Sequence, residues 1–328
     1  MKIKKLLVLL LVFPISICTI TTGVNAAKKD DNQVPERMYI YKQYARYTDI
    51  PWYIIGAIDQ YERNTKNYRK YCKKDEEIIS ICFDPVLWSG YANPREDDQN
   101  LDTIYLFQGM GVDGDGDGLA ERLNTYDRLQ AMLNYISSYG KGKKEIEAAL
   151  LNYYKVEKGV NIIFTIAKLF EQYDTVELGK RVFPIPKHYA GDYTNNYGTG
   201  RSWGGYRIHE GVDIFSHYGT PVVSTAYGVV EIIGWNEFGG YRLGIRDMYN
   251  TYEYYAHLNG YAKGLEEGDI VEPGQVIGYV GSTGYGKEGT SGKFPPHLHF
   301  GFYKFDGRKE WSFNPYHYIN KWERVSLK

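Results

Sequence analysis

The spacing of apolar residues changes once along this chain, and the change separates two predicted regions. Between residues 33 and 172, apolar side chains recur every three to four positions, which is the period of a helix with one buried face. The clearest runs cover residues 52–61, 126–139, 146–154 and 160–170. Pro51 suits the first turn of the first of these helices, and Asp49 is the expected cap. The pattern therefore predicts an all-α N-terminal domain over residues 33–172.

The pattern changes near residues 183–186, where Phe-Pro-Ile-Pro cannot continue a helix. Beyond this point glycines are frequent, and short β-type runs alternate with turn signals such as Gly239-Gly240. These runs cover residues 221–224, 228–233, 252–256, 276–280 and 297–303. We therefore expect a multidomain α plus β protein. A linker at 173–183 would connect the helical domain to a mostly antiparallel β domain at 184–320.

The first 26 residues have the pattern of an export signal. Lysines at positions 2, 4 and 5 precede an apolar run over 6–20, and Val24-Asn25-Ala26 offers a small-residue cleavage site. The run is short for a membrane span, which needs about 20 apolar residues. We expect residues 1–26 to be removed and the mature chain to be exported, outside the cell or into the wall, without stable membrane insertion. An uncleaved signal anchor is the alternative.

The charge balance and the cysteine spacing argue against two kinds of site, one for nucleic acid and one for zinc held by cysteines. The chain has 39 basic and 40 acidic residues, so it lacks the basic excess that is typical of nucleic-acid binding, and no nucleic-acid partner is expected. Cys72 and Cys82 lie ten residues apart and, after export, either form a disulfide or stay as two buried thiols. Neither belongs to a zinc-binding cysteine pattern.

Three short motifs in the C-terminal half hold four of the seven histidines. They are His209-Glu-Gly-Val-Asp213, Tyr-Ala-His257-Leu and His297-Leu-His299. On a strand, residues i and i+2 face the same side, so His297 and His299 can converge on one ion and its surroundings. A ligand set of His, Asp and His suits Zn²⁺ and leaves one position open, while further histidines can move protons. The motifs together predict a zinc hydrolase.

Residues 183–318 resemble the lysostaphin/LytM-type zinc metallopeptidases of bacterial cell walls. The resemblance is carried by the three histidine motifs together with Gly219-Thr-Pro-Val222, residues 271–278 and Gly281-Ser-Thr-Gly284. It implies that His209, Asp213 and His299 bind one zinc ion and that His257 and His297 are catalytic. It also implies hydrolysis of peptide bonds in peptidoglycan. Which of His257 and His297 acts as the base stays open, as does the oligomeric state.

The N-terminal half carries a second resemblance. Residues 50–62 are similar to the opening of lysozyme-like lytic transglycosylases, in which a helix ends in a catalytic glutamate, here Glu62. The Glu-Ser pair of that family is Glu62-Arg63 in this chain, so we expect a non-catalytic domain that binds glycan. A glycan-cleaving acid at Glu62 is the alternative.

A glycine-rich acidic loop precedes residue 119. Asp113, Asp115 and Asp117 match the start of a calcium-binding loop, but the twelfth position is Asn124 where an EF-hand has a bidentate glutamate. The alternatives are a calcium site of another geometry, on these three aspartates, and a polar turn without an ion.

The full layout is similar to that of the LytH-type enzymes of spore-forming Gram-positive bacteria, in which an export signal and a helical region precede a C-terminal peptidase. This resemblance implies cleavage of the L-Ala–D-Glu stem bond during spore cortex maturation, outside the membrane or in the forespore cortex space. The alternatives are a D,D- or glycine-bridge endopeptidase, a bifunctional autolysin that uses Glu62, and a non-catalytic wall-binding regulator.

Overall fold

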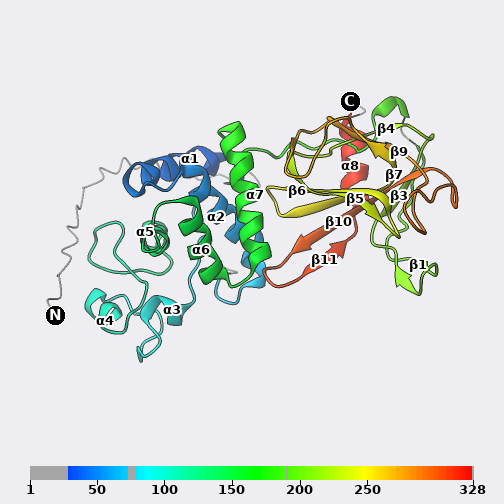
Figure 1. Ribbon diagram of the computed structural model, residues 1–328. Helices are drawn as coiled ribbons and strands as arrows, with labels where there is room; N and C mark the ends of the chain where they lie inside the picture. The colour runs from blue at the N-terminus through cyan, green and yellow to red at the C-terminus, as the bar shows by residue number, and fades with distance from the viewer. Residues whose placement is uncertain (1–28, 73–77, 190, 327–328) are drawn as a thin grey trace. The chain divides into compact units, whose positions relative to one another are not determined.

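The computed structural model describes residues 29–72, 78–189 and 191–326 (Figure 1). The predicted signal peptide lies outside the described residues. The chain divides into two compact units, of which the first comprises residues 1–40 and 69–149 and the second residues 41–68 and 150–328. The domain boundary predicted at 173–183 stays a prediction. In the described ranges, no helix combines the length and the apolar character needed to cross a bilayer.

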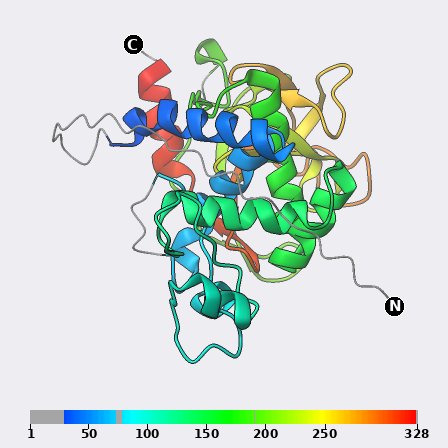
Figure 2. The ribbon, with the colours of Figure 1, turned by 90° about the vertical axis from the view of Figure 1, so that its left-hand side faces the viewer.

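The first unit is helical. It contains α3 (Pro85–Ser89), α4 (Leu101–Leu106) and α5 (Thr125–Ser137), and α1 (Lys29–Thr48) and α6 (Lys143–Tyr154) each continue into the second unit. Figures 1 and 2 show α3 and α4, in cyan, as short helices joined by long loops. The helix predicted at 126–139 is α5, and the side chain of Asn124 caps it by accepting the backbone N–H of Tyr126.

Two further helices belong to the second unit. These are α2 (Trp52–Thr65), followed by a short 3₁₀ helix (Lys66–Tyr68), and α7 (Glu157–Tyr173). Trp52 of α2 stacks on Phe170 of α7, with ring centroids 6.3 Å apart. The predicted cap at Asp49 is wrong, because Pro51 itself occupies the capping position and no side chain caps this end. Asp49 instead adopts a left-handed backbone conformation two residues earlier.

The rest of the second unit is built on antiparallel strands. A nine-stranded sheet has β11-β10-β7-β6-β5-β8 as its main path; β3 joins at β10, and β9 pairs with β4 and β7. A separate hairpin pairs β1 (Gly200–Arg201) with β2 (Arg207–Ile208). A 3₁₀ helix (Lys187–Tyr189) precedes the strands and α8 (Tyr316–Ser326) follows them. The strands of the sheet are β3 (Val212–Phe215), β4 (Pro221–Val223), β5 (Gly228–Asn236), β6 (Gly240–Asp247), β7 (Thr251–Tyr261), β8 (Ile270–Val271), β9 (Val276–Val280), β10 (His297–Phe305) and β11 (Glu310–Phe313).

These elements confirm the coarse fold prediction, with helices in the N-terminal part and an antiparallel sheet in the C-terminal part. All pairings between the named strands are antiparallel. The lysozyme-like character of the helical region stays a prediction.

Strand β10 shows how the core orients the functional residues. Leu298, Phe300 and Phe302 are buried in the hydrophobic core of the sheet, where Trp322 of α8 packs against Phe302 at a centroid distance of 5.8 Å. Because side chains alternate along a strand, the residues between them point to the opposite face. The two histidines at the start of β10 therefore lie on the face that the core does not cover.

Candidate metal centre and active site

Strand pairing brings the three predicted metal ligands together. In the pairing of β10 with β3, His299 lies directly opposite Asp213. His209 lies just before β3, four residues upstream of Asp213. Residues that are separated by 86 positions thus become cross-strand neighbours, a pairing that the motifs did not predict.

The ligating atoms of these residues form a small triangle. His209 Nε2 lies 2.9 Å from His299 Nδ1 and 2.9 Å from Asp213 Oδ1, and His299 Nδ1 lies 3.2 Å from the same oxygen. Tetrahedral zinc ligands about 2.0–2.1 Å from the ion are spaced by about 3.3 Å. Two imidazole nitrogens and a carboxylate oxygen at these separations therefore fit a zinc ion after a small outward relaxation.

Asn196 and Arg201 hold the ligands from behind. The side-chain amide of Asn196 donates to Asp213 Oδ2 at 3.0 Å, and its backbone carbonyl lies 2.9 Å from His209 Nδ1. Arg201 donates to the same Asp213 oxygen at 2.5 Å. With Nδ1 of His209 as the donor to a carbonyl, Nε2 carries the lone pair that points at the triangle. Neither residue belongs to one of the motifs, so neither was predicted from the sequence.

Gly211 allows the ligands to approach one another. A Cβ atom at this position would lie 2.6 Å from the carbonyl oxygen of Phe300 and 2.7 Å from Cε1 of His299. Neither a strand carbonyl nor a ligand ring can move away without disturbing the triangle. The glycine of the first motif is thus required by close contact.

His257 and His297 lie beside the triangle, and each ring is oriented by a hydrogen bond from Nδ1 to a backbone carbonyl. Nδ1 of His257 is 2.8 Å from the carbonyl of Thr283, and Nδ1 of His297 is 2.8 Å from the carbonyl of Pro295. Each Nδ1–H therefore donates to the backbone, which leaves Nε2 as the proton acceptor. The two ring centroids are 4.8 Å apart. His257 also has a backbone φ of 63°, a strained conformation of the kind found at functional sites.

Burial and neighbouring charge set the protonation of this group. Burial lowers the pKa of His257, and the nearby imidazoles of His297 and His299 lower it further. Burial also lowers the pKa values of His297 and His299, although Asp213 opposes that shift. Burial opposes ionisation of Asp213, but the imidazoles of His209 and His299 beside it outweigh burial and hold the pKa of that carboxyl well below its usual range.

All five predicted residues line one half-open cavity of about 590 Å³. Much of its remaining wall is aromatic, from Phe215, Phe238, Tyr254, Tyr285, Phe294 and Tyr303. Glu210 lies next to a ligand but is held on the wall by hydroxyls of Ser312, at 3.0 Å, and Tyr303, at 3.3 Å. A cavity of this size accommodates a short extended peptide next to the triangle.

Comparison with known proteins identifies the family. Residues 207–315 match Peptidase family M23. The chain is also 50% identical over 302 residues to the L-Ala–D-Glu endopeptidase of Bacillus subtilis (strain 168), which covers 92% of this chain and 93% of that protein. The chain belongs to peptidase family M23. The predicted peptidase class is thereby confirmed, while the roles of the five residues stay a prediction.

Other relatives of this M23 peptidase match a smaller part of it. Lysostaphin from Staphylococcus simulans is 35% identical over 120 residues, which is 34% of this chain and 22% of lysostaphin. Among solved structures, the catalytic domain of lysostaphin is 30% identical with a TM-score of 0.32, and the match covers 40% of this chain and 93% of that one.

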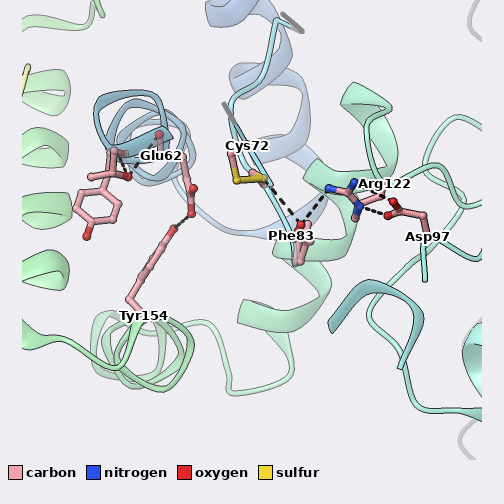
Figure 3. Close-up of a disulfide and its surroundings, with 9 residues drawn as sticks. Glu62, Cys72, Phe83, Asp97, Arg122 and Tyr154 are labelled. Carbon is pink, nitrogen blue, oxygen red and sulfur yellow. Dashed lines mark hydrogen bonds and ion pairs between the residues drawn. A yellow bond between two sulfur atoms is a disulfide. The ribbon is translucent and has the colours of Figure 1, made fainter. Parts of the chain in front are cut away.

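Glu62 of the M23 peptidase is not placed like a glycan-cleaving acid. Its side chain is fully buried at the end of α2, where it accepts a hydrogen bond of 2.7 Å from the hydroxyl of Tyr154 (Figure 3). Asp59, one turn earlier, is equally buried and accepts a hydrogen bond of 2.5 Å from Tyr41. A general acid must reach the oxygen that it protonates, and a glycan cannot reach Glu62 in this conformation.

The acidic loop gathers a different set of residues from the one predicted. Carboxylate oxygens of Asp113, Asp115 and Asp127 lie within 4.8 Å of one another, whereas Asp117 accepts the backbone N–H of Leu119. Both oxygens of Asp127 accept backbone N–H groups, at 2.7 Å and 2.6 Å. The calcium site predicted at Asp113, Asp115 and Asp117 is not supported.

The first unit of the peptidase also contains a disulfide. Cys72 and Cys82 are joined, which selects one of the two alternatives that the sequence left open. Near it, the guanidinium of Arg122 pairs with Asp97 and donates to the carbonyl of Phe83 at 3.2 Å (Figure 3). These contacts tie together a part of the unit in which long loops predominate.

Proposed function

We propose that this M23 peptidase is an exported zinc endopeptidase that hydrolyses the L-Ala–D-Glu bond in the stem peptides of peptidoglycan. The observation that carries the choice of bond is the identity of 50% across 92% of the chain with an endopeptidase named for that bond. The likeness to lysostaphin is limited to 34% of the chain. A likeness that includes the helical region as well as the peptidase sheet supports the same specificity.

In this proposal His209, Asp213 and His299 hold the zinc ion. Their three ligating atoms face one another at 2.9–3.2 Å, and Asn196 and Arg201 occupy the outward-facing atoms. Bound zinc supplies Lewis acidity, which makes water more acidic and polarises a peptide carbonyl. The protein contributes a fixed ligand geometry that needs no reorganisation when substrate enters.

His257 and His297 are the proposed catalytic residues. Each has Nε2 available as a proton acceptor, because the backbone carbonyls of Thr283 and Pro295 take the protons on Nδ1. One of them accepts the proton of the attacking water at Nε2 and passes it to the leaving amine. The other, protonated at Nε2, donates that N–H to the oxyanion that forms on the peptide carbonyl. This geometry assigns neither role to one ring, because the centroids are 4.8 Å apart and each Nδ1 is bonded to a backbone carbonyl.

The finer parts of the proposal concern the cellular setting. Export through the predicted signal at residues 1–26 places the enzyme at its substrate, and the LytH-like layout supports action during spore cortex maturation. We propose a non-catalytic, glycan-binding role for the lysozyme-like helical region, and the burial of Glu62 supports the absence of a second cleaving activity.

Fragment analysis of digested cell wall tests the proposal. Purified peptidoglycan is incubated with the zinc-loaded enzyme, and the new termini are identified by mass spectrometry after amine labelling. We expect new amino groups on D-Glu and new carboxyl groups on L-Ala. New amino termini on the D,D cross-link or on glycine would contradict the proposed bond, and 1,6-anhydro sugar ends would restore Glu62 as a catalytic acid. A sample depleted of zinc and then reloaded controls for contaminating hydrolases.

A further inference from the structure

The β1–β2 hairpin carries two arginines next to the predicted zinc site, and among the described residues only one of them has an acidic partner. Arg201 and Arg207 are directly opposite each other across the hairpin. Both line the cavity that contains the five histidine and aspartate residues. Arg201 pairs with Asp213 Oδ2 at 2.5 Å. Opposed residues on antiparallel strands lie about 5 Å apart at Cα, so Arg207 is one cross-strand step from a side chain that touches a ligand.

Arg207 is held by neutral groups. Its guanidinium donates to the carbonyl of Trp203 at 2.9 Å and lies 3.5 Å from the hydroxyl of Tyr285. The side chain is half-buried, yet it makes no ion pair with any carboxylate in the described part of the chain. Two like charges opposite each other in a hairpin destabilise it. Asp213 compensates one of them, so the charge of Arg207 has no counterpart within the described residues.

An aromatic frame fixes the direction of this guanidinium. Its Cζ lies 4.7 Å from the ring centroid of Phe238 and 5.7 Å from that of Tyr285. Trp203 stacks on Tyr285 with a centroid distance of 4.6 Å and an angle of 7°, and Lys293 donates to the carbonyl of Tyr285 at 2.7 Å. Tyr285 holds a left-handed φ of 57°, which is costly for a bulky residue. Backbone strain of this kind clusters at active sites and ligand-binding sites.

The proposed substrate contains an anion close to the reacting bond. When a glutamate residue contributes its nitrogen to the scissile amide, one of its two carboxyls continues the peptide and the other is a free carboxylate. That carboxylate is only a few bonds from the scissile nitrogen. Glycine-bridge bonds have no such group on the residues that they join. A half-buried guanidinium with spare N–H donors is the side chain best suited to recognise a carboxylate.

We propose that Arg207 is a specificity-determining residue that binds the free carboxylate of the D-Glu residue at the scissile bond. This inference rests on the proposed function and deepens it. Phe238 and Tyr285 shield the guanidinium from water, which strengthens its pairing with an anion. Arg201 has a separate task, because Asp213 already occupies it. In this proposal Arg201 of the hairpin binds the metal ligand Asp213, and Arg207 binds the substrate.

Two peptides that differ in one group test the inference. The first is a stem peptide with the free D-Glu carboxylate, and the second has a carboxamide at that position. We measure kcat/KM of the full-length zinc enzyme on both. We expect the wild type to prefer the carboxylate by about 10- to 100-fold, mainly through KM, and R207Q to lower that ratio towards one. R207K, which retains the charge but loses the fork, should retain part of the preference. R308Q, which changes an exposed arginine outside the cavity, should leave the ratio unchanged.

A ratio that stays at the wild-type value in R207Q, even with lower rates, would mean that Arg207 only braces the aromatic frame, and it would overturn the inference. A wild-type ratio of one would do the same. Calorimetric binding of the leaving peptide, with N-terminal D-Glu or its carboxamide, separates this result from a failure of the proposed function. If the enzyme releases other termini from the wall, carboxylate-independent binding overturns the Arg207 inference, and carboxylate-dependent binding that R207Q abolishes supports it.

Discussion

The groups His209/Asp213/His299 and Asp113/Asp115/Asp127 each bring three potential ligand atoms within 4.8 Å, yet they differ in how those atoms are used. In the first group, Asn196 and Arg201 bind the outward atoms, and the inward atoms face one another. In the second group, backbone N–H groups occupy the carboxylates. Asp113 accepts from Gly116 at 2.6 Å and from Gly118 at 2.8 Å, for example.

The difference shows that proximity of acidic or imidazole groups does not by itself make a metal site. The first group keeps lone pairs directed at a common point because other residues satisfy the remaining atoms. The second group uses its lone pairs to organise a glycine-rich loop, which is a common role of aspartate in turns. Orientation of the lone pairs therefore separates a ligand set from a structural cluster.

Removal of a ligand should have the largest effect. We expect His209→Ala to reduce bound zinc from about one ion per chain to a small fraction and to reduce wall hydrolysis by at least about 1000-fold, because two ligands do not hold the ion at micromolar concentrations. Metal analysis by mass spectrometry and release of wall fragments measure both quantities. Asp115→Asn in the acidic loop should retain the zinc, and equal zinc loss in both variants would contradict the distinction between the two groups.

Insertion of a methyl group between the ligands should be almost as damaging. Gly211→Ala places Cβ against the carbonyl of Phe300 and the ring of His299, so the ring must shift. We expect a loss of about 100-fold in kcat/KM, with weaker zinc binding. Gly260→Ala is the matched control, because a Cβ there meets no atom within 4 Å. Unchanged zinc affinity in Gly211→Ala would show that the site tolerates the displacement.

Loss of the Asn196 side chain, which bonds a metal ligand from outside the triangle, should have an intermediate effect on zinc binding. Asn196→Ala removes the amide that binds Asp213 but keeps the carbonyl near His209, so we expect zinc affinity to fall by about 10- to 100-fold. Excess zinc should restore most of the activity, which separates a positioning role from a catalytic one. Asn195→Ala is the control, since its side chain bonds Asn314 instead. A defect that zinc does not rescue would argue for direct contact with substrate.

The smallest expected effect is a pH dependence of the stability of the acidic loop. Burial raises the pKa of Asp127 to about 6, and the charges of Asp115 and Asp113 add to it although two backbone N–H groups oppose it. The folded state therefore binds this proton more tightly than the unfolded state, whose carboxyl has a pKa near 4. The resulting stability is complete below about pH 4 and is lost as pH rises through about 6. Asp127→Asn should remove this slope while lowering stability overall.

Hydrogen exchange of residues 114–127 between pH 4 and 7, corrected for the intrinsic rate, measures this dependence. An identical slope in the wild type and in Asp127→Asn would show that the carboxyl is ionised throughout the range. The experiment also sharpens the comparison of the two groups, because a bound cation would lower the pKa of Asp127 and reverse the slope.

Much of the metal centre was predictable from sequence, because spacing and strand geometry act together. His297 and His299 share a face for the same reason that Leu298 and Phe300 share the core, and the antiparallel pairing then places Asp213 opposite His299. The change from helical to β spacing was predictable for a similar reason, since burial of one face imposes a period on each element.

The supporting residues were not predictable in this way. Asn196 lies in an irregular loop with no motif, and its three contacts with His209 and Asp213 arise from the path of the backbone. The burial of Glu62 depends on Tyr154, which is 92 positions away. No sequence pattern distinguishes Arg207 from a surface arginine, and only the hairpin pairing places it opposite Arg201. Packing between residues far apart in the sequence decides such contacts, so the local spacing of residues does not predict them.

The close contact at Gly211 has a consequence for the history of such genes. Every single-base change in a glycine codon that alters the amino acid introduces a residue with a Cβ atom, or a stop. No neighbouring codon can therefore substitute at this position, whereas many can at Gly260, where space is open. One nucleotide change at Gly211 should therefore weaken the hydrolase severely while leaving its recognisable histidines in place.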